Sequence, residues 1–225
     1  MSQILVLCDD MWHPAEVIQK GLAPLEGDEF HFDFVMAAKD ILTPELIAEY
    51  PLIICCKGNS VIAANRAPWF ENTVTEVMAP EFRAYVEAGG GFLCVHSGNT
   101  FGGDGDGVAE YREFVGNRFT GHPLRCGIVA KKCSDHPIMA GVADEFDIRD
   151  EHYQMTDIAE DADVFLKTTS PKGGTQVAGY TRAMGKGRLC VLTPGHVLSV
   201  WHHPEFQKIL VNAMNWCMDK RGGAR

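Results

Sequence analysis

Short apolar segments alternate along this chain with segments of helical periodicity, and this alternation limits the fold more than any other feature. Strand-like runs occupy 3–8, 31–37 and 51–56, and helical patterns occupy 15–25 and 43–50 between them. The run at 51–56 is continuously apolar, as strands of a parallel sheet are when helices cover both faces. The order of the segments therefore predicts an α/β fold built on a parallel sheet.

The second half of the chain continues the pattern. The further elements expected are a helix at 79–90, strands at 91–96, 124–130, 163–169, 175–180 and 188–194, and a helix at 204–218. Thr43 as N-cap and Pro44 at the first helical position are strong signals for a helix start. With 225 residues, 46 % of them apolar, and no repeat or linker, the chain suits a single domain over 1–218 with a frayed tail at 219–225.

Charge and cysteine usage narrow the class of ligand. The formal net charge is −10 and no basic run is longer than the two residues Lys131-Lys132, which disfavours nucleic acid or an anionic membrane as partner. No segment approaches the roughly 20 apolar residues of a membrane span, so we expect a soluble, cytoplasmic protein that binds a small polar molecule. The eight cysteines form no C-x-x-C pair and are expected to be reduced core thiols.

Polar residues follow several of the predicted strands directly. In open parallel sheets, ligands bind beyond the carboxyl ends of the strands. His13 follows the first predicted strand, the segment that holds His96, Ser97 and Asn99 comes at the end of the fourth, and His196 follows a later one. Three histidines from separate strands can form an open site for a divalent metal, zinc or manganese, or can act as acid/base or hydrogen-bonding groups.

The sequence His96-Ser97-Gly98-Asn99 after a buried strand resembles a nucleophile elbow in layout. Neither G-x-S-x-G nor the C-x-G of class I glutamine amidotransferases is present, and His96 stands where the amidotransferase thiol would be. A cysteine nucleophile is therefore disfavoured. A hydrolase that uses Ser97 with a histidine remains an alternative, although serines beside glycines commonly form turns.

Asp150 and Glu151 end an alternating segment. One carboxylate of the pair can serve as general base or metal ligand while the other faces water. The alternative is a solvated acidic turn with Tyr153 packed beneath it. The histidines before the last helix are also candidates, and Pro204 at the first helical position makes His203 a capping-region residue.

Two loops receive an expectation but no firm role. The Gly- and Asp-rich segment 101–111 is expected to be a polar loop over the rim, and it lacks the ligand spacing of an EF-hand. The segment 59–74, which includes Trp69, is expected to act as a lid or as a contact between two copies of the chain.

Six segments together resemble the ThuA-like, or trehalose-utilisation, family from His13 to Trp216. They are "HP" after the first strand, "GGGFLCVHSGNTF", "HPIMAGV", "DEHY", "GKGRLCVLTPGH" and "HHPEFQKILVNAMNW". The resemblance implies a class I glutamine amidotransferase-like fold, a flavodoxin-like three-layer sandwich with a mostly parallel central sheet, without the glutaminase cysteine. It also implies a polar rim of His13, His96, Ser97, Glu151, His196 and His203. The "HP" segment is the loosest match, because family members often carry His-Glu there.

The resemblance further implies a role in the catabolism of trehalose or related disaccharides, beside an oxidoreductase that makes 3-keto sugars. The leading hypothesis is an enzyme that acts on a disaccharide or its 3-keto derivative, with Glu151 as base and His96 and His196 polarising the carbonyl. Further substrate contacts are expected from His13, Asn99, Tyr153, His203 and Trp201.

The competing hypothesis is a non-catalytic sugar-binding or partner subunit with a degenerate site. In that case Trp12, Trp69 and Trp201 would stack on sugar rings. A homo-oligomer is compatible with both hypotheses.

Overall fold

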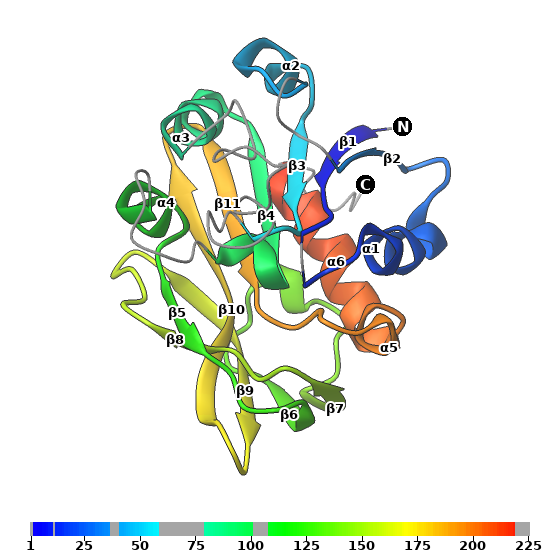
Figure 1. Ribbon diagram of the computed structural model, residues 1–225, viewed down its shortest axis with the longest axis vertical. Helices are drawn as coiled ribbons and strands as arrows, with labels where there is room; N and C mark the ends of the chain where they lie inside the picture. The colour runs from blue at the N-terminus through cyan, green and yellow to red at the C-terminus, as the bar shows by residue number, and fades with distance from the viewer. Residues whose placement is uncertain (1, 11, 37–40, 59–78, 101–107, 219–225) are drawn as a thin grey trace, which may run out of the picture.

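A nine-stranded mixed sheet forms the centre of the molecule (Figure 1), with the strand order β2-β1-β3-β4-β11-β10-β9-β6-β7. The structure is a computed structural model, and it describes residues 2–10, 12–36, 41–58, 79–100 and 108–218. The prediction of an α/β fold is confirmed. The predicted sheet was mostly parallel, whereas four of the nine strands extend it in antiparallel fashion.

Five neighbouring strands make up the parallel half. They are β1 (Ser2–Leu7), β2 (Phe30–Val35), β3 (Leu52–Cys55), β4 (Gly91–Val95) and β11 (Gly187–Leu192). Every residue of β3 and β4 is buried, because helices cover both faces of this half. The alternation of apolar runs and helical patterns was therefore a valid predictor of this half.

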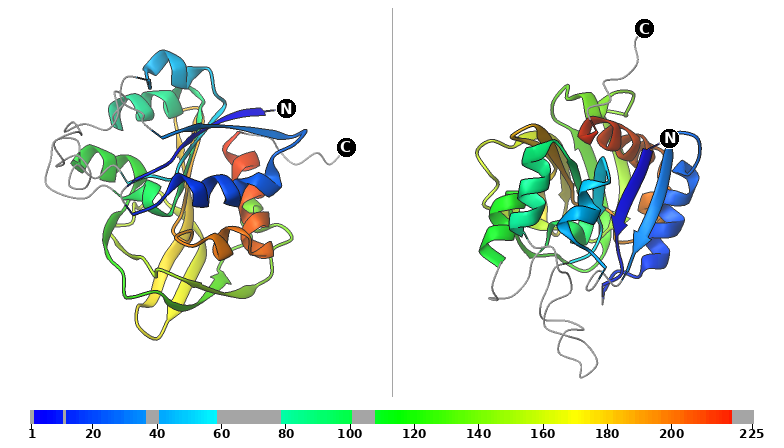
Figure 2. Two further views of the ribbon diagram at one scale, coloured as in Figure 1. Left: turned by 45° about the vertical axis from the view of Figure 1, so that its right-hand side comes forward. Right: turned by 90° about the horizontal axis from the view of Figure 1, so that it is seen from above.

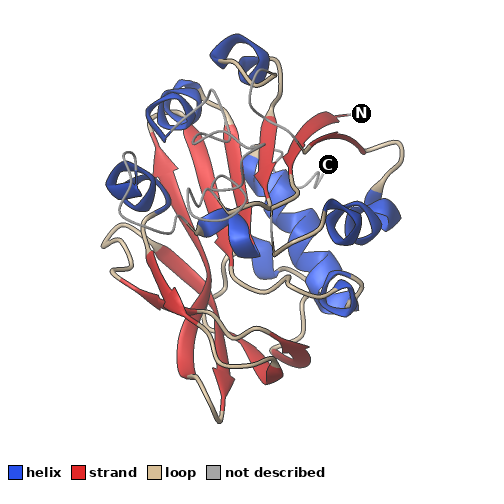
Figure 3. Cartoon of the chain, viewed as in Figure 1, coloured by secondary structure: helices blue, strands red, loops and turns tan. Residues whose placement is uncertain are grey.

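Helices pack on the two faces in separate groups (Figure 3). The first apolar cluster joins one face of the sheet to α1 (Ala15–Leu22), α5 (Leu198–Trp201) and α6 (Pro204–Cys217). The second joins the other face to α2 (Pro44–Ala48), α3 (Ala79–Ala88) and α4 (Val108–Val115). The result is a three-layer arrangement around the parallel strands.

The antiparallel half consists of β10 (Gly174–Met184), β9 (Asp163–Ser170), β6 (Cys126–Lys132) and β7 (Glu145–Asp150). Buried and exposed residues alternate along β7, which is typical of a strand with one face in solvent. A separate two-stranded sheet pairs β5 (Arg118–Gly121) with β8 (Gln154–Thr156). Figure 2 shows the extension of the sheet from two further sides.

The helix start at Thr43 and Pro44 is confirmed, since the Thr43 hydroxyl accepts from the Leu46 N–H at 3.2 Å. The predicted helix at 15–25 ends as an α-helix at Leu22, and a 3₁₀ turn with Pro24 follows.

All eight cysteines are free thiols, as predicted, and six of them are buried. Burial raises the pKa of Cys8 to about 12, with smaller contributions from neighbouring charges. None of the helices in the described part of the chain has the length and apolar character needed to cross a membrane.

Candidate functional site

His96 occupies a strained position directly after β4. The 3₁₀ turn His96–Asn99 begins there, and His96 has φ 50°, which is uncommon for a residue other than glycine. Gly98 packs so closely that a Cβ atom would lie 1.7 Å from the Cys55 carbonyl oxygen. Such strain costs on the order of 1–3 kcal/mol and clusters at functional sites. The strand therefore presents His96, in the manner of a nucleophile elbow.

The tautomer of His96 follows from its surroundings. Its Nδ1 lies 2.8 Å from the Thr193 carbonyl oxygen, which can only accept, so Nδ1 carries the proton. Its Nε2 is buried and has no hydrogen-bond partner. A buried nitrogen lone pair without a donor is costly unless a proton or a metal ion engages it. His96 is thus oriented as a ligand or as an acceptor.

His13 has the same arrangement on the neighbouring loop. Its Nδ1 lies 2.7 Å from the Asp10 carboxylate, and its Nε2 is buried without a partner. The other Asp10 oxygen accepts from the Gly58 N–H at 2.6 Å, which fixes the carboxylate. Burial opposes ionisation of Asp10, but the hydrogen bond and charge of His13 outweigh it and lower the pKa of Asp10. A carboxylate behind an imidazole is the usual outer partner of a metal-binding histidine.

His196 reaches the same point from the turn after β11. Its Nδ1 lies 3.2 Å from Glu151 Oε2. Burial lowers its pKa to about 4, and the nearby histidines and Arg125 add to this while Glu151 opposes it. The imidazole is therefore neutral at neutral pH, which is the form that binds metal ions.

Glu151 faces three imidazole rings at once. Its Oε2 is 3.4 Å from His96 Nε2, 3.2 Å from His196 Nδ1 and 3.4 Å from His122 Nε2. Burial raises the pKa of Glu151, but the three imidazole rings that face it, His96 foremost, outweigh this effect, so the pKa lies below its ordinary value. Because the carboxylate oxygen and the bare His96 nitrogen are both acceptors, their closeness favours a cation or a proton between them.

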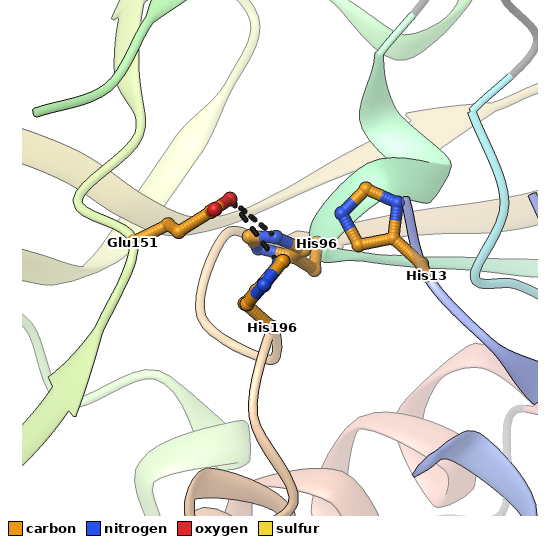
Figure 4. A group of neighbouring side chains, drawn as sticks. All are labelled: His13, His96, Glu151 and His196. Carbon is orange, nitrogen blue, oxygen red and sulfur yellow. Dashed lines mark ion pairs between the residues drawn. The ribbon is translucent and has the colours of Figure 1, made fainter. Parts of the chain in front are cut away.

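These four side chains form one compact group, seen in Figure 4. One donor atom from each of His13, His96, Glu151 and His196 can be chosen so that all four lie within 4.8 Å of one another. The rings meet edge to face, with centroids 5.0–5.4 Å apart. Three nitrogens and one carboxylate oxygen match the donor set of zinc and related divalent ions.

Other predicted residues lie beneath this group and serve its framework. The Ser97 hydroxyl donates to the Cys56 carbonyl oxygen at 2.8 Å, and Asn99 Nδ2 donates to the His96 carbonyl oxygen at 2.5 Å. Tyr153 is 3 % exposed, with its ring centroid 4.0 Å from that of His96. Tyr153 therefore packs as the alternative of a solvated acidic turn expected, but the acidic pair above it is not solvated.

His203 and Trp201 do not face the group of four. His203 is the N-cap of α6, where its Nδ1 accepts from the Glu205 N–H, and its ring stacks on Phe146. Trp201 is fully buried and donates from Nε1 to the Gly195 carbonyl oxygen at 2.7 Å. The expectation that these two side chains contact a sugar is therefore wrong for this structure, since both are committed to packing and capping.

The expectation that one carboxylate of the Asp150-Glu151 pair faces water is also wrong. Asp150 is fully buried, and Glu151 has a side chain only 14 % exposed.

Sequence reasoning missed His122, which touches Glu151 from the segment after β5. The short strand β5 lacks an apolar run, so nothing marked His122 as a rim residue. The segment 59–74 and residues 101–107 of the predicted polar loop lie outside the described residues.

The parallel strands of this α/β fold thus carry three imidazoles to one rim, where the Glu151 carboxylate joins them from the end of the antiparallel strand β7. This is the framework of a metal-binding or acid/base protein. The chain belongs to the ThuA family, described as trehalose utilisation, whose model matches residues 5–217. The prediction of this family is confirmed.

Solved structures share the fold at low sequence identity. A ThuA-like protein of Bacteroides uniformis has a TM-score of 0.71 and 18 % identity, covering 98 % of this chain and 93 % of its own. One from Parabacteroides merdae has a TM-score of 0.69 and 15 % identity, with coverages of 100 % and 92 %. A cytoplasmic protein of Salmonella typhimurium has a TM-score of 0.64 and 15 % identity, with coverages of 96 % and 99 %. No curated protein matches the sequence.

Proposed function

We propose that this protein is a metal-dependent enzyme of sugar catabolism that acts on a disaccharide or its 3-keto derivative. The metal site is supported above all by one observation. Two buried imidazole nitrogens without hydrogen-bond partners, His13 Nε2 and His96 Nε2, lie in the same group as Glu151 and His196. Membership of the trehalose-utilisation family supports the sugar. A bound divalent cation would supply Lewis-acid stabilisation of negative charge at a carbonyl oxygen.

The residues divide into holding and shaping roles in this proposal. His13, His96 and His196 are the nitrogen ligands, and His13 and His96 are each fixed by a bond from Nδ1 to an oxygen. Glu151, ionised at neutral pH because its pKa is lowered, fits the ligand set better than a free base. The fold of a class I glutamine amidotransferase fits the strained residue after β4, with an imidazole in place of the thiol.

A non-catalytic sugar-binding role is the second candidate. Trp12 stands directly before His13 and is 68 % exposed, which suits stacking on a sugar ring. In that role no histidine needs to act chemically, and a His96→Ala variant would bind its sugar as tightly as the wild type.

The first experiment combines metal analysis with a substrate test. Protein purified without chelators is analysed for zinc and manganese, and a 3-keto disaccharide is then supplied in deuterated water. The proposal expects near-stoichiometric metal, with turnover or deuterium uptake beside the ketone that a chelator abolishes. A protein that takes up no divalent ion at all would overturn the metal-dependent mechanism, and binding without turnover would favour the second candidate.

The role of Glu151 is tested by Glu151→Gln, which keeps the size of the side chain. As a ligand, its loss weakens metal affinity together with turnover. If the variant keeps full metal affinity and loses only turnover, Glu151 is the general base instead.

We also propose that the protein works in the cytoplasm beside a sugar oxidoreductase that supplies the keto sugar. Size-exclusion chromatography with light scattering, alone and with such an oxidoreductase, measures whether the chain forms homo-oligomers or a complex.

A further inference from the structure

Asp150 is a buried carboxylate with an unusual set of partners. It is the last residue of β7 and is fully buried. One of its oxygens accepts from the Gly195 N–H at 2.7 Å, and the His196 N–H lies 3.2 and 3.3 Å from its two oxygens. Burying a carboxylate costs free energy unless it is well paired, so this position calls for a specific reason.

Asp150 holds the turn Gly195–His196, and His196 is a candidate metal ligand. Gly195 has φ 136°, in the region that favours glycine, and its carbonyl oxygen accepts from Trp201 Nε1. The turn is therefore fixed on one side by an indole donor and on the other by the Asp150 carboxylate. With both backbone N–H groups bound, the direction in which the His196 side chain leaves the backbone is set.

The same residue precedes Glu151, so it fixes a second candidate ligand through the chain. Asp150 thus joins the end of an antiparallel strand, β7, to the turn that follows the parallel strand β11. A carboxylate offers an acceptor oxygen on both sides of these N–H donors, whereas an asparagine keeps one oxygen and turns an NH₂ group toward the other position. Burial raises the pKa of Asp150, while His96 and the backbone N–H groups oppose that rise.

We propose that Asp150 is the positioning residue of the metal site, which sets affinity and geometry by holding His196 and Glu151 in register with each other. This inference rests on the proposed metal site. Asp150 touches neither the cation nor substrate; it acts through the Gly195–His196 turn. Outer partners of metal ligands typically contribute about 10- to 100-fold in metal affinity.

The test uses Co²⁺ as probe, because its visible absorption reports both occupancy and ligand geometry. The full chain, its Asp150→Asn variant and a control, Thr181→Val, are titrated with Co²⁺ after removal of metal. Thr181 is 3 % exposed and bonds His136, so the control loses a buried polar contact that involves none of the four ligands. Thermal unfolding without metal gives the structural effect of each substitution.

The expected result is Co²⁺ affinity lower by about 10- to 100-fold in Asp150→Asn, with a shifted visible spectrum, and unchanged affinity and spectrum in Thr181→Val. Affinity and spectrum in Asp150→Asn equal to those of the wild type would overturn the inference and leave the metal site standing. A wild type that binds no Co²⁺ would overturn both. If Asp150→Asn does not fold, Asp150→Glu replaces it, and there a wild-type spectrum is the contradicting outcome.

Discussion

The molecule contains two kinds of histidine with buried ring nitrogens, and their difference separates function from structure. His13, His96 and His196 each leave one ring nitrogen buried without a hydrogen-bond partner. His136 and His152 use both: His136 bonds the Ile138 N–H and the Thr181 hydroxyl, and His152 bonds two hydroxyl side chains. Burial alone therefore does not mark a functional histidine.

The distinguishing feature is the chemistry of the partners. A hydroxyl can donate or accept, so Ser170 and Thr168 satisfy His152 in its neutral form. The carbonyl and carboxylate behind His96 and His13 can only accept, so Nδ1 of each ring carries a proton, and each Nε2 has no hydrogen-bond partner among the described residues. We call a histidine open when one of its ring nitrogens lacks a hydrogen-bond partner, and closed when both are bonded, as in His136 and His152. The open histidines are available to bind a ligand, and the closed ones complete the core.

The largest difference between the two kinds is expected from removing an open histidine. His96→Ala and His196→Ala should each abolish stoichiometric metal binding and turnover, because a four-ligand site loses one donor. The loss of folding stability should be smaller than for a closed histidine, since His96 Nε2 has no hydrogen bond to lose. Elemental analysis and urea unfolding measure the two quantities. Retained metal in both variants would remove the distinction.

Removing a closed histidine should have the opposite profile. His152→Ala leaves the Ser170 and Thr168 hydroxyls buried without their imidazole partner, at a cost of about 1–3 kcal/mol in the free energy of unfolding. Metal affinity should stay at the wild-type value. Elemental analysis and urea unfolding again measure metal content and stability. A loss of metal without a loss of stability would place His152 among the open histidines.

Lowering the pH should reduce the free energy of unfolding of the metal-free protein through its closed histidines. Burial lowers the pKa of His136 below its ordinary value of 6.5, and Asp163 only partly opposes this. Below about pH 6.5 the unfolded chain therefore binds a proton that the folded chain does not, so the free energy of unfolding of the metal-free protein falls as the pH drops.

His136→Asn is the matched variant for this effect, because an asparagine oxygen can still accept from the Ile138 N–H. Urea unfolding at about pH 7 and about pH 5 should give a smaller decrease for the variant than for the wild type. His152 and His196, whose pKa values burial also lowers, keep the remaining slope. Equal slopes in both proteins would contradict the assignment of His136.

The smallest effect is expected at Ser97. Its hydroxyl is 1 % exposed and donates to the Cys56 carbonyl oxygen, so Ser97→Ala should cost about 1 kcal/mol of stability and preserve turnover. Loss of turnover with an intact fold and intact metal binding, or labelling of Ser97 by a serine-directed inhibitor, would revive the hydrolase alternative.

The sequence predicted the parallel half of the fold well because its information is local. Continuous apolar runs such as β3 require cover on both faces, and the rule for carboxyl ends of strands then places His13, His96 and His196 at one rim. The antiparallel half was harder, since alternation in β7 signals an exposed face but carries no information about direction or neighbours.

Errors at the site have a common physical origin. His203, Trp201 and Asp150 were assigned by residue type, but each is hydrogen-bonded within the protein. His203 bonds an N–H of the first turn of α6, Trp201 bonds a carbonyl oxygen, and Asp150 bonds two backbone N–H groups. Whether a polar group is free depends on long-range contacts, which residue type does not reveal. His122 was missed for the converse reason, because only folding brings it to Glu151.

The four candidate ligands stand at 13, 96, 151 and 196, after strands from both halves of the sheet. An unfolded chain does not hold such distant positions within 4.8 Å, so a bound ion would favour the folded state alone. Mass action then adds about 2.7 kcal/mol to the free energy of unfolding at a free ion concentration 100 times Kd. The bound ion would therefore hold distant parts of the chain together, and the concentration of available metal would set the free energy of unfolding of the protein.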